Sequence, residues 1–350
     1  MMKKTLIAAV FALFFSSIWI VSCKKDTIDP STWEPVSFSV PYGWPQPVYT
    51  FTNNPLTSDG FTLGRKLFYD VRLSRDNTIS CGSCHQQFAA FAHLDHDVSH
   101  GIYGLLGTRN SPGMFNLAWH PSFFWDGGVN HLESQPINPL QSHVEMDMTL
   151  PEVVARVAAD NDYRARFKKA FGDETVNTQR IFRAMSLFMA AMVSDNSRYD
   201  KHEKNLPGGT FSDAEERGLK LFRQHCATCH KEPLFSDFSF RNNGLVPKSS
   251  VNDSGRAHIT RSVDDLYKFK VPSLRNVALT RPYMHDGRFM SLESSVEHYR
   301  TGIIHSATTD PKLSSNINIS DQEKSDIVSF LHTLTDSTFI TNKLFAEPVN

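Results

Sequence analysis

The chain has 350 residues, a formal net charge of −1 and 21% charged residues. This balance provides neither the basic surface of a nucleic-acid-binding protein nor an attraction to anionic membranes, so we exclude both as partners. The length is sufficient for two hydrophobic cores of ordinary domain size.

The N-terminus predicts export. Two lysines precede an apolar stretch, 6–21, that is too short for a stable transmembrane helix and typical of a secretion signal covering 1–22. Residues 20–23 (Ile-Val-Ser-Cys) resemble a bacterial lipobox, in which the cysteine is lipidated after cleavage. The alternative is an ordinary signal peptide with an unrelated thiol. We expect a periplasmic protein that contacts the membrane only through a lipid anchor on Cys23.

Residues 23–57 are rich in Pro, Ser and Thr, which predicts a lipoprotein tether followed by an extended N-terminal arm. Strand signals are sparse in the rest of the chain, and helix signals dominate. In chain order they are a cap at 58–60, a start at Thr149 with proline in the first turn, a long helix over about 177–195, and capping boxes at Ser212 and Ser320.

The long helix over 177–195 contains methionines that are candidate iron ligands. Met185, Met189 and Met192 recur at helical spacing, together with other apolar side chains. This pattern favours packing in the core over binding to iron.

Four cysteines lie in two pentapeptides of one pattern, CGSCH at 81–85 and CATCH at 226–230. Two thiols three residues apart can form thioethers to the vinyl groups of one porphyrin, and the next histidine can bind its iron. A zinc site would need the cysteine pairs much closer in sequence, and disulfides would leave both histidines unexplained. We expect two covalently bound haem c groups, held by Cys81, Cys84 and His85 and by Cys226, Cys229 and His230.

The two halves of the chain repeat one arrangement, because a predicted helix precedes each pentapeptide. Residues 205–210 (Asn-Leu-Pro-Gly-Gly-Thr) are typical of a linker between domains. The sequence therefore predicts a mainly α fold with two cytochrome c-like haem domains, one at 58–205 and one at 206–350.

Further motifs occur in a characteristic order. The first half contains SHG at 99–101, TRNSP at 108–112, FWDG at 124–127, Gln135 and VEM at 144–146; the second contains VPSLRN at 271–276, LTRPY at 279–283, HDG at 285–287, LE at 292–293 and Tyr299. From about 63 to 334, this order and spacing resemble the bacterial di-haem cytochrome c peroxidases and their MauG-type relatives.

The resemblance implies that the N-terminal domain is peroxidatic. His85 would be the proximal ligand, and His100 is a candidate distal ligand that must leave before peroxide binds; an exposed loop histidine is the alternative. Glu145 matches the family's distal acid, which would move a proton between the peroxide oxygens as their bond breaks. Without the resemblance, Glu145 would be interpreted as a solvated surface acid. Gln135 matches a neighbour that orients peroxide or water.

Two features of the family lie between the domains. Trp125 matches the aromatic residue between the two haems, where it would carry electrons; core packing is the alternative and is compatible with that role. The resemblance also implies one Ca²⁺, bound by Asn110, Thr280 and Pro282 through one side-chain oxygen and two backbone carbonyls. From the sequence alone these three would be interpreted as turn residues.

The resemblance implies that the second haem receives electrons. Peroxidases of the family place a methionine on this iron, but Tyr299 occupies the position here, as in MauG-type enzymes. A phenolate stabilises ferric iron, whereas a thioether raises the potential. Met284 is an alternative ligand. His298 is a weaker one, because neighbouring residues on a helix point in different directions.

The resemblance implies an oxidoreductase that reduces hydrogen peroxide to water with electrons from a small donor protein, a cytochrome c or a cupredoxin. It also implies that the chain can form a homodimer. The alternative is a MauG-like oxidase that acts on a partner protein or small molecule through a high-valent iron state. Tyr299 favours the oxidase, and His100 favours the peroxidase. A third hypothesis, an electron carrier without catalysis, is disfavoured by Glu145 and Gln135.

Overall fold

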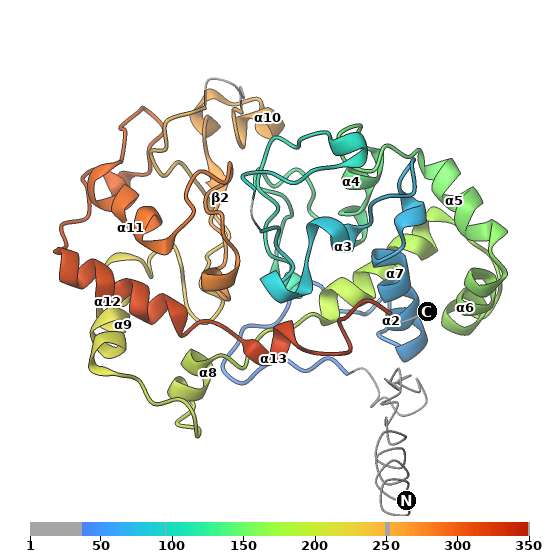
Figure 1. The fold of residues 1–350 in the computed structure, drawn as a ribbon, viewed down its shortest axis with the longest axis horizontal. Helices are drawn as coiled ribbons and strands as arrows, with labels where there is room; N and C mark the ends of the chain where they lie inside the picture. Colours follow the sequence, from blue (N-terminus) through green and yellow to red (C-terminus); the bar gives the residue numbers. More distant parts are fainter. Residues whose placement is uncertain (1–36, 95, 249–252, 349–350) are drawn as a thin grey trace, which may run out of the picture. The chain divides into compact units, whose positions relative to one another are not determined.

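The computed structural model describes residues 37–94, 96–248 and 253–348. The predictions for the signal peptide and for Cys23 therefore lie outside the described residues. The described chain is mainly helical, which confirms the predicted fold class, and none of its helices is long and apolar enough to cross a membrane (Figure 1). The α-helices are α2 (Ser58–Phe68), α3 (Cys81–Cys84), α4 (Ile137–Gln141), α5 (Leu150–Ala159), α6 (Asn161–Phe171), α7 (Thr178–Ala191), α8 (Arg198–Glu203), α9 (Asp213–His225), α10 (Ala257–Thr260), α11 (Leu292–Thr301), α12 (Asp321–His332) and α13 (Ser337–Ile340).

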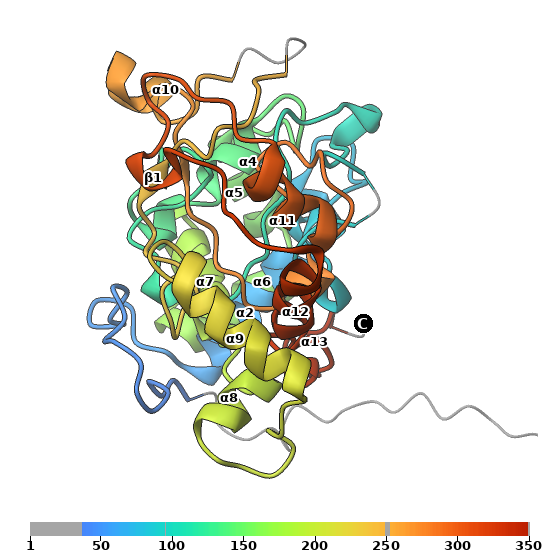
Figure 2. The same cartoon turned by 90° about the vertical axis from the view of Figure 1, so that its left-hand side faces the viewer.

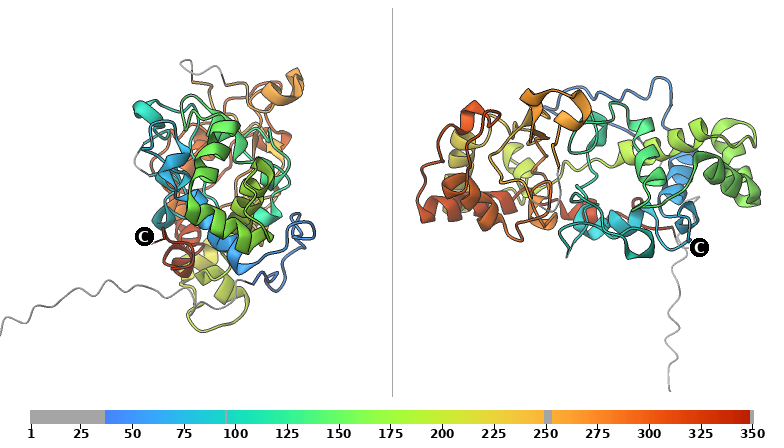
Figure 3. Two further views of the ribbon diagram at one scale, coloured as in Figure 1. Left: turned by 90° about the vertical axis from the view of Figure 1, so that its right-hand side faces the viewer. Right: turned by 90° about the horizontal axis from the view of Figure 1, so that it is seen from above.

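A first hydrophobic core is built on the contact between α2 and α7, with α6 packed against α2 (Figure 3). The backbones of α2 and α7 approach closely at Gly64, where a Cβ atom would collide with the carbonyl oxygen of Ala184. Met185, Met189 and Met192 are buried in this core, which confirms their predicted packing role.

Two details of these helices differ from the prediction. The cap of α2 is Thr57 rather than 58–60, because the Thr57 hydroxyl accepts the backbone N–H of Gly60 at 3.0 Å. Helix α7 ends at 191 rather than about 195. Asn116 pairs with the chain just beyond α7: its N–H donates to Met192 O at 2.8 Å, and its side chain accepts from Ser194 N at 2.8 Å.

A second hydrophobic core is built on α9 and α12, which lie side by side (Figure 2). Here a Cβ atom at Gly218 would collide with the carbonyl oxygen of Asp326. Both helices begin with the predicted capping boxes, Ser212 with Glu215 and Ser320 with Glu323. Thr149 with Glu152 forms a third box, at the start of α5.

The only sheet in the described residues is an antiparallel pair, β1 (Phe240–Arg241) and β2 (Phe269–Lys270). After the second core the chain returns to the first. Phe339 of α13 and Phe345 are buried in the first core, and Tyr69 donates from its hydroxyl to Phe345 O at 2.7 Å. The C-terminal segment thus contributes to the core that α2 and α7 begin, while the domain boundary at 205/206 stays a prediction.

A buried ion pair connects segments from both halves. Arg275 is 0% exposed and donates to both carboxylate oxygens of Asp200, which is 4% exposed, at 2.8 and 2.7 Å. The guanidinium also donates to Pro233 O at 2.9 Å and lies 4.5 Å from the centre of the Trp44 ring. Burial alone would raise the pKa of Asp200, but the bonds from Arg275 outweigh it and lower the pKa. The pair is therefore charged in the folded protein.

We expect Arg275→Met to lower the free energy of unfolding by ~3–5 kcal/mol, because it leaves the Asp200 carboxylate buried without its partner. Arg180→Met is the control, since it removes a pair with Asp173 that is open to solvent and should cost under ~1 kcal/mol. Chemical denaturation followed by circular dichroism measures both changes. Equal effects of the two substitutions would show that the buried pair does not stabilise the fold.

Candidate functional site

The two pentapeptides adopt the same local turn. His85 N donates to Cys81 O at 2.9 Å, and His230 N donates to Cys226 O at the same distance. The first turn is α3, which begins after Ser80, and the second follows directly from the end of α9. In each pentapeptide, the turn holds the histidine on the same short segment as its two cysteines. One segment can therefore attach a haem through thioethers and bind its iron.

Each of these histidines is held through Nδ1. His85 Nδ1 donates to Phe91 O at 2.7 Å, and His230 Nδ1 lies 3.2 Å from Phe235 O and 3.1 Å from Pro272 O. Because a carbonyl only accepts, Nδ1 carries the proton and Nε2 keeps its lone pair for a metal. Burial lowers the pKa of His85 to about 4 and also lowers the pKa of His230. Both rings are therefore neutral at neutral pH, the form that binds iron.

One cavity of about 340 Å³ is lined by His85 and by most of the second pentapeptide. Most of the site residues that the sequence predicts line this cavity. These are His85, Asn110, Trp125, Gln135, Cys226, Cys229, His230, Thr280, Pro282, Met284 and Tyr299. Its wall does not include Cys81, Cys84, His100 or Glu145.

The loops that carry His100 and Glu145 meet elsewhere, beside the first pentapeptide. The thiol of Cys84 lies 3.7 Å from His100 O, and Ile102 N donates to Glu145 O at 2.9 Å. A Cβ atom at Gly101 would collide with the carbonyl oxygen of Val144, so the two loops touch backbone to backbone. His100 itself is exposed, and its ring lies 4.8 Å from that of His96.

The Glu145 side chain is exposed, although nearby protein displaces part of the water around its carboxyl. Loss of hydration raises the pKa of its carboxyl above the ordinary value, against the lowering effect of a bond from Ser142. A carboxyl whose pKa moves towards neutrality can both take and return a proton.

Trp125 connects the two halves of the chain. Its indole N–H donates to Asn110 O at 2.9 Å, and its own carbonyl accepts Lys270 N at 2.7 Å. Asn110 N in turn donates to His285 O at 2.8 Å. The indole is thus bonded to its own half, and the Trp125 backbone is bonded to the other half.

The two candidate ligands of the second iron share one neighbour. Tyr299 and Met284 both line the cavity. The side-chain amide of Asn243 donates to Met284 Sδ at 3.5 Å and lies close enough to Tyr299 to favour its ionised form. Burial raises the pKa of Tyr299 to about 12. His298 points elsewhere, since its Nε2 donates to Asn243 O at 2.9 Å.

Sequence reasoning missed a polar cluster at the cavity. His120 Nε2 and Ser122 Oγ are buried without hydrogen-bond partners in the described chain, and His120 lines the cavity with Lys270. Lys270 Nζ donates to Ser122 O at 2.7 Å but has no carboxylate within 4.0 Å among the described residues, and burial lowers its pKa to about 7. No motif marks this cluster, because Lys270 comes from a segment far from His120 and Ser122 in the sequence.

Unsatisfied buried polar groups are costly, and a ligand with carboxylates would satisfy them. Haem c carries two propionates, and its apolar ring suits the aromatic and aliphatic remainder of the cavity wall. With the paired histidine and cysteine turns, these groups fit a c-type haem.

Comparison with known proteins agrees with this site. The profile of the family described as di-haem cytochrome c peroxidase matches residues 58–206, and the cytochrome c profile matches 215–335. The chain is 35% identical to methylamine utilization protein MauG of Methylorubrum extorquens, over 88% of this chain and 87% of that protein. It is 34% identical to cytochrome c551 peroxidase of Nitrosomonas europaea, over 83% of each.

Among solved structures, a MauG-like protein associated with microbial copper homeostasis is similar, with a TM-score of 0.81 and 34% identity. That similarity covers 89% of this chain and 99% of the other.

We expect Gly101→Ala to slow the reaction with hydrogen peroxide by about 10²-fold. The added Cβ atom would collide with the Val144 carbonyl oxygen and push the His100 loop away from the loop that carries Glu145. Both haems should remain attached. Gly107→Ala is the control in the same loop, since the nearest atom to a Cβ there is 3.6 Å away. Stopped-flow absorbance and haem content per chain measure the outcome; equal rates in the two variants would contradict the proposed contact.

Proposed function

Because the chain belongs to the di-haem cytochrome c peroxidase family, we propose that it reduces hydrogen peroxide to water with electrons from a small donor protein. It is an oxidoreductase with two c-type haems. The observation that carries the proposal is the contact between the His100 and Glu145 loops beside the first pentapeptide.

The haem supplies an iron at which peroxide can bind and accept electrons. Glu145 can take a proton from one oxygen of hydrogen peroxide and return it to the other, so that water leaves as the O–O bond breaks. Its raised pKa supports this role, because a carboxyl that holds its proton more strongly than usual can keep that proton until it is returned. Gln135 lines the cavity and would orient peroxide or water through its amide.

Electrons would enter at the second haem and reach the first through or near Trp125. The bond from the indole to Asn110 and the bond from Lys270 to the Trp125 carbonyl support the proposal, since they hold Trp125 at the wall of the cavity that His85 and His230 both line. A cytochrome c or a cupredoxin is the proposed donor.

Three finer assignments accompany this proposal. Ca²⁺ would bind at Asn110, Thr280 and Pro282, which are all among the residues that line the cavity. The protein would be exported to the periplasm and anchored by a lipid on Cys23. It would also form a homodimer.

We expect Glu145→Gln to lower peroxide turnover by ~10²–10⁴-fold, because the amide has a similar shape but cannot accept the proton. Haem content should be unchanged. Glu174→Gln is the control, since Glu174 is exposed and its cationic neighbour Arg164 is 3.8 Å away. Steady-state oxidation of reduced cytochrome c by peroxide measures turnover. Full activity in Glu145→Gln would remove Glu145 from the mechanism.

We expect Trp125→Phe to slow electron transfer between the haems by about tenfold, which corresponds to ~1.4 kcal/mol in activation free energy. The reaction of the first haem with peroxide should keep its rate. Trp119→Phe is the control, because Trp119 is buried, donates to Pro45 O at 2.8 Å and does not line the cavity. Stopped-flow spectroscopy of the half-reduced protein measures both steps, and unchanged transfer in Trp125→Phe would contradict the route.

A second candidate function is a MauG-like oxidase. Tyr299 favours it, because this side chain lies at the second haem cavity where peroxidases of the family have methionine. The oxidase would be favoured if an oxidised form of the protein persists after all peroxide is consumed. Reduced cytochrome c should then fail to reduce that form. Failure to react with peroxide in any redox state would leave electron transfer without catalysis.

A further inference from the structure

Two side chains at the second haem site can each bind iron, and one amide contacts both. Tyr299 and Met284 line the cavity that also contains the second pentapeptide, 226–230. The Asn243 amide donates to Met284 Sδ at 3.5 Å and lies close enough to the Tyr299 side chain to lower its pKa against the larger raising effect of burial. The thioether and the phenol therefore lie on the same side of one cavity, within reach of a single group.

The two candidate ligands differ in how firmly the backbone holds them. Tyr299 is on α11, and its carbonyl accepts Ile317 N at 2.8 Å. Met284 lies in the turn closed by the pairing of Tyr283 with Phe289, and its φ is 73°. The unbranched Met284 side chain can change rotamer without moving a helix.

The chemistry of the two ligands is complementary. A phenolate is hard and anionic and stabilises ferric iron, whereas a thioether is soft and stabilises ferrous iron. We propose that the second haem exchanges Tyr299 for Met284 when it accepts an electron, with Asn243 binding whichever side chain is off the iron. This inference rests on the proposed function in one respect, that electrons enter at this haem.

One electron from the donor protein would reduce ferric to ferrous iron, the bond between iron and the Tyr299 oxygen would break, and the bond between iron and the Met284 sulfur would form. The phenolate oxygen would take up one proton supplied by the buffered solvent, and oxidation would reverse every step, returning the electron and the proton. No other reactant is required.

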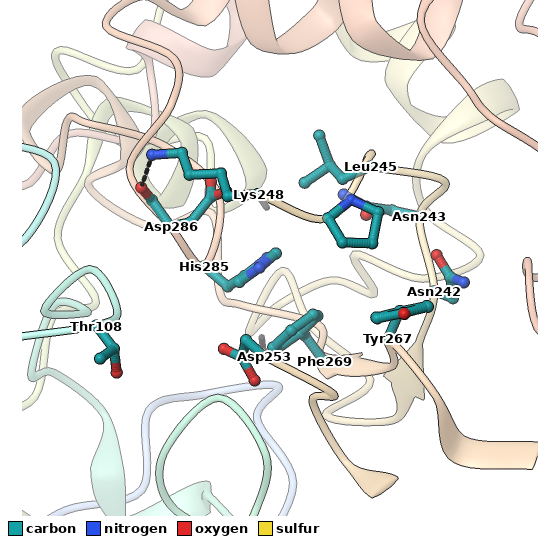
Figure 4. Close-up of a pocket in the computed structure, with 11 residues that line it drawn as sticks. Thr108, Asn242, Asn243, Leu245, Lys248, Asp253, Tyr267, Phe269, His285 and Asp286 are labelled. Atoms are coloured by element: carbon teal, nitrogen blue, oxygen red, sulfur yellow. Dashed lines mark hydrogen bonds between the residues drawn. The ribbon is translucent and has the colours of Figure 1, made fainter. Parts of the chain in front are cut away.

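A small cavity next to Asn243 could hold the water that delivers a proton to the Tyr299 phenolate. It has a volume of about 20 Å³, enough for one water molecule, and Asn243, His285 and Asp286 are among the residues that line it (Figure 4). Asn243, Phe269 and His285 line both this cavity and the haem cavity. Water in the small cavity would therefore lie one side chain away from Tyr299.

Carbon monoxide tests the exchange in the reduced holoprotein, because it binds ferrous haem that lacks a strong distal ligand. We expect Met284→Leu to bind one more carbon monoxide per chain than the wild type. Met290→Leu is the matched control, since Met290 is in the next turn, 48% exposed and outside the cavity wall, and should match the wild type. Met284→Gln, which keeps the side-chain length, repeats the test if the leucine variant loses haem.

Resonance Raman spectroscopy of the ferric forms provides the second measurement. Tyrosinate bands should be present in the wild type and in Met284→Leu and absent in Tyr299→Phe. Equal carbon monoxide binding by wild type and both Met284 variants, or no tyrosinate bands in the ferric wild type, would overturn the exchange. The amount of carbon monoxide bound by the wild type tests the proposed function separately. If the wild type binds none, the first haem has no free coordination position for peroxide. Even then, one additional carbon monoxide per chain in Met284→Leu would support the ligand exchange.

Discussion

The arrangement of this protein depends on two imidazoles that are each held by a hydrogen bond from Nδ1 to a backbone carbonyl. Those carbonyls belong to segments that follow the pentapeptides, at Phe91 in one half and at Phe235 and Pro272 in the other. Fixing Nδ1 as the donor fixes the tautomer, and burial keeps both rings neutral. The remaining nitrogen of each ring is then available to iron, and both rings line one cavity.

The halves are connected most tightly where electrons would pass. Trp125 is held by Asn110 on its own side and by Lys270 from the other half, and Asn110 is bonded to His285. Two of these bonds join backbone to backbone, and the third joins the indole to a backbone carbonyl, so they tolerate less movement than contacts between long side chains. The ion pair of Arg275 with Asp200 adds a second connection away from the cavity. Two independent cores can therefore maintain a constant separation between their haem sites.

The two haem sites differ in what surrounds them. The first is bordered by an exposed loop that carries His100 and by a carboxyl with a raised pKa. The second has a phenol and a thioether in its cavity, next to one amide. Under the proposed function, the first set of groups would act on a small oxidant, and the second would supply ligands to an iron that transfers electrons. This difference explains how two copies of one cytochrome c-like arrangement can have separate roles.

The sequence by itself determined the features that depend on local spacing. The cysteines and histidines of the pentapeptides are adjacent in the chain, and the capping boxes at Ser212 and Ser320 span only four residues, so both were predictable. Only the tertiary structure decided the end of α7, where Asn116 forms hydrogen bonds with the backbone that follows the helix. It decided the cluster of His120, Ser122 and Lys270 as well. It also decided the meeting of Asn243 with Met284 and Tyr299. The physical reason is the same in each case: these groups are brought together by packing between segments tens of residues apart, and no local pattern records which segments will meet.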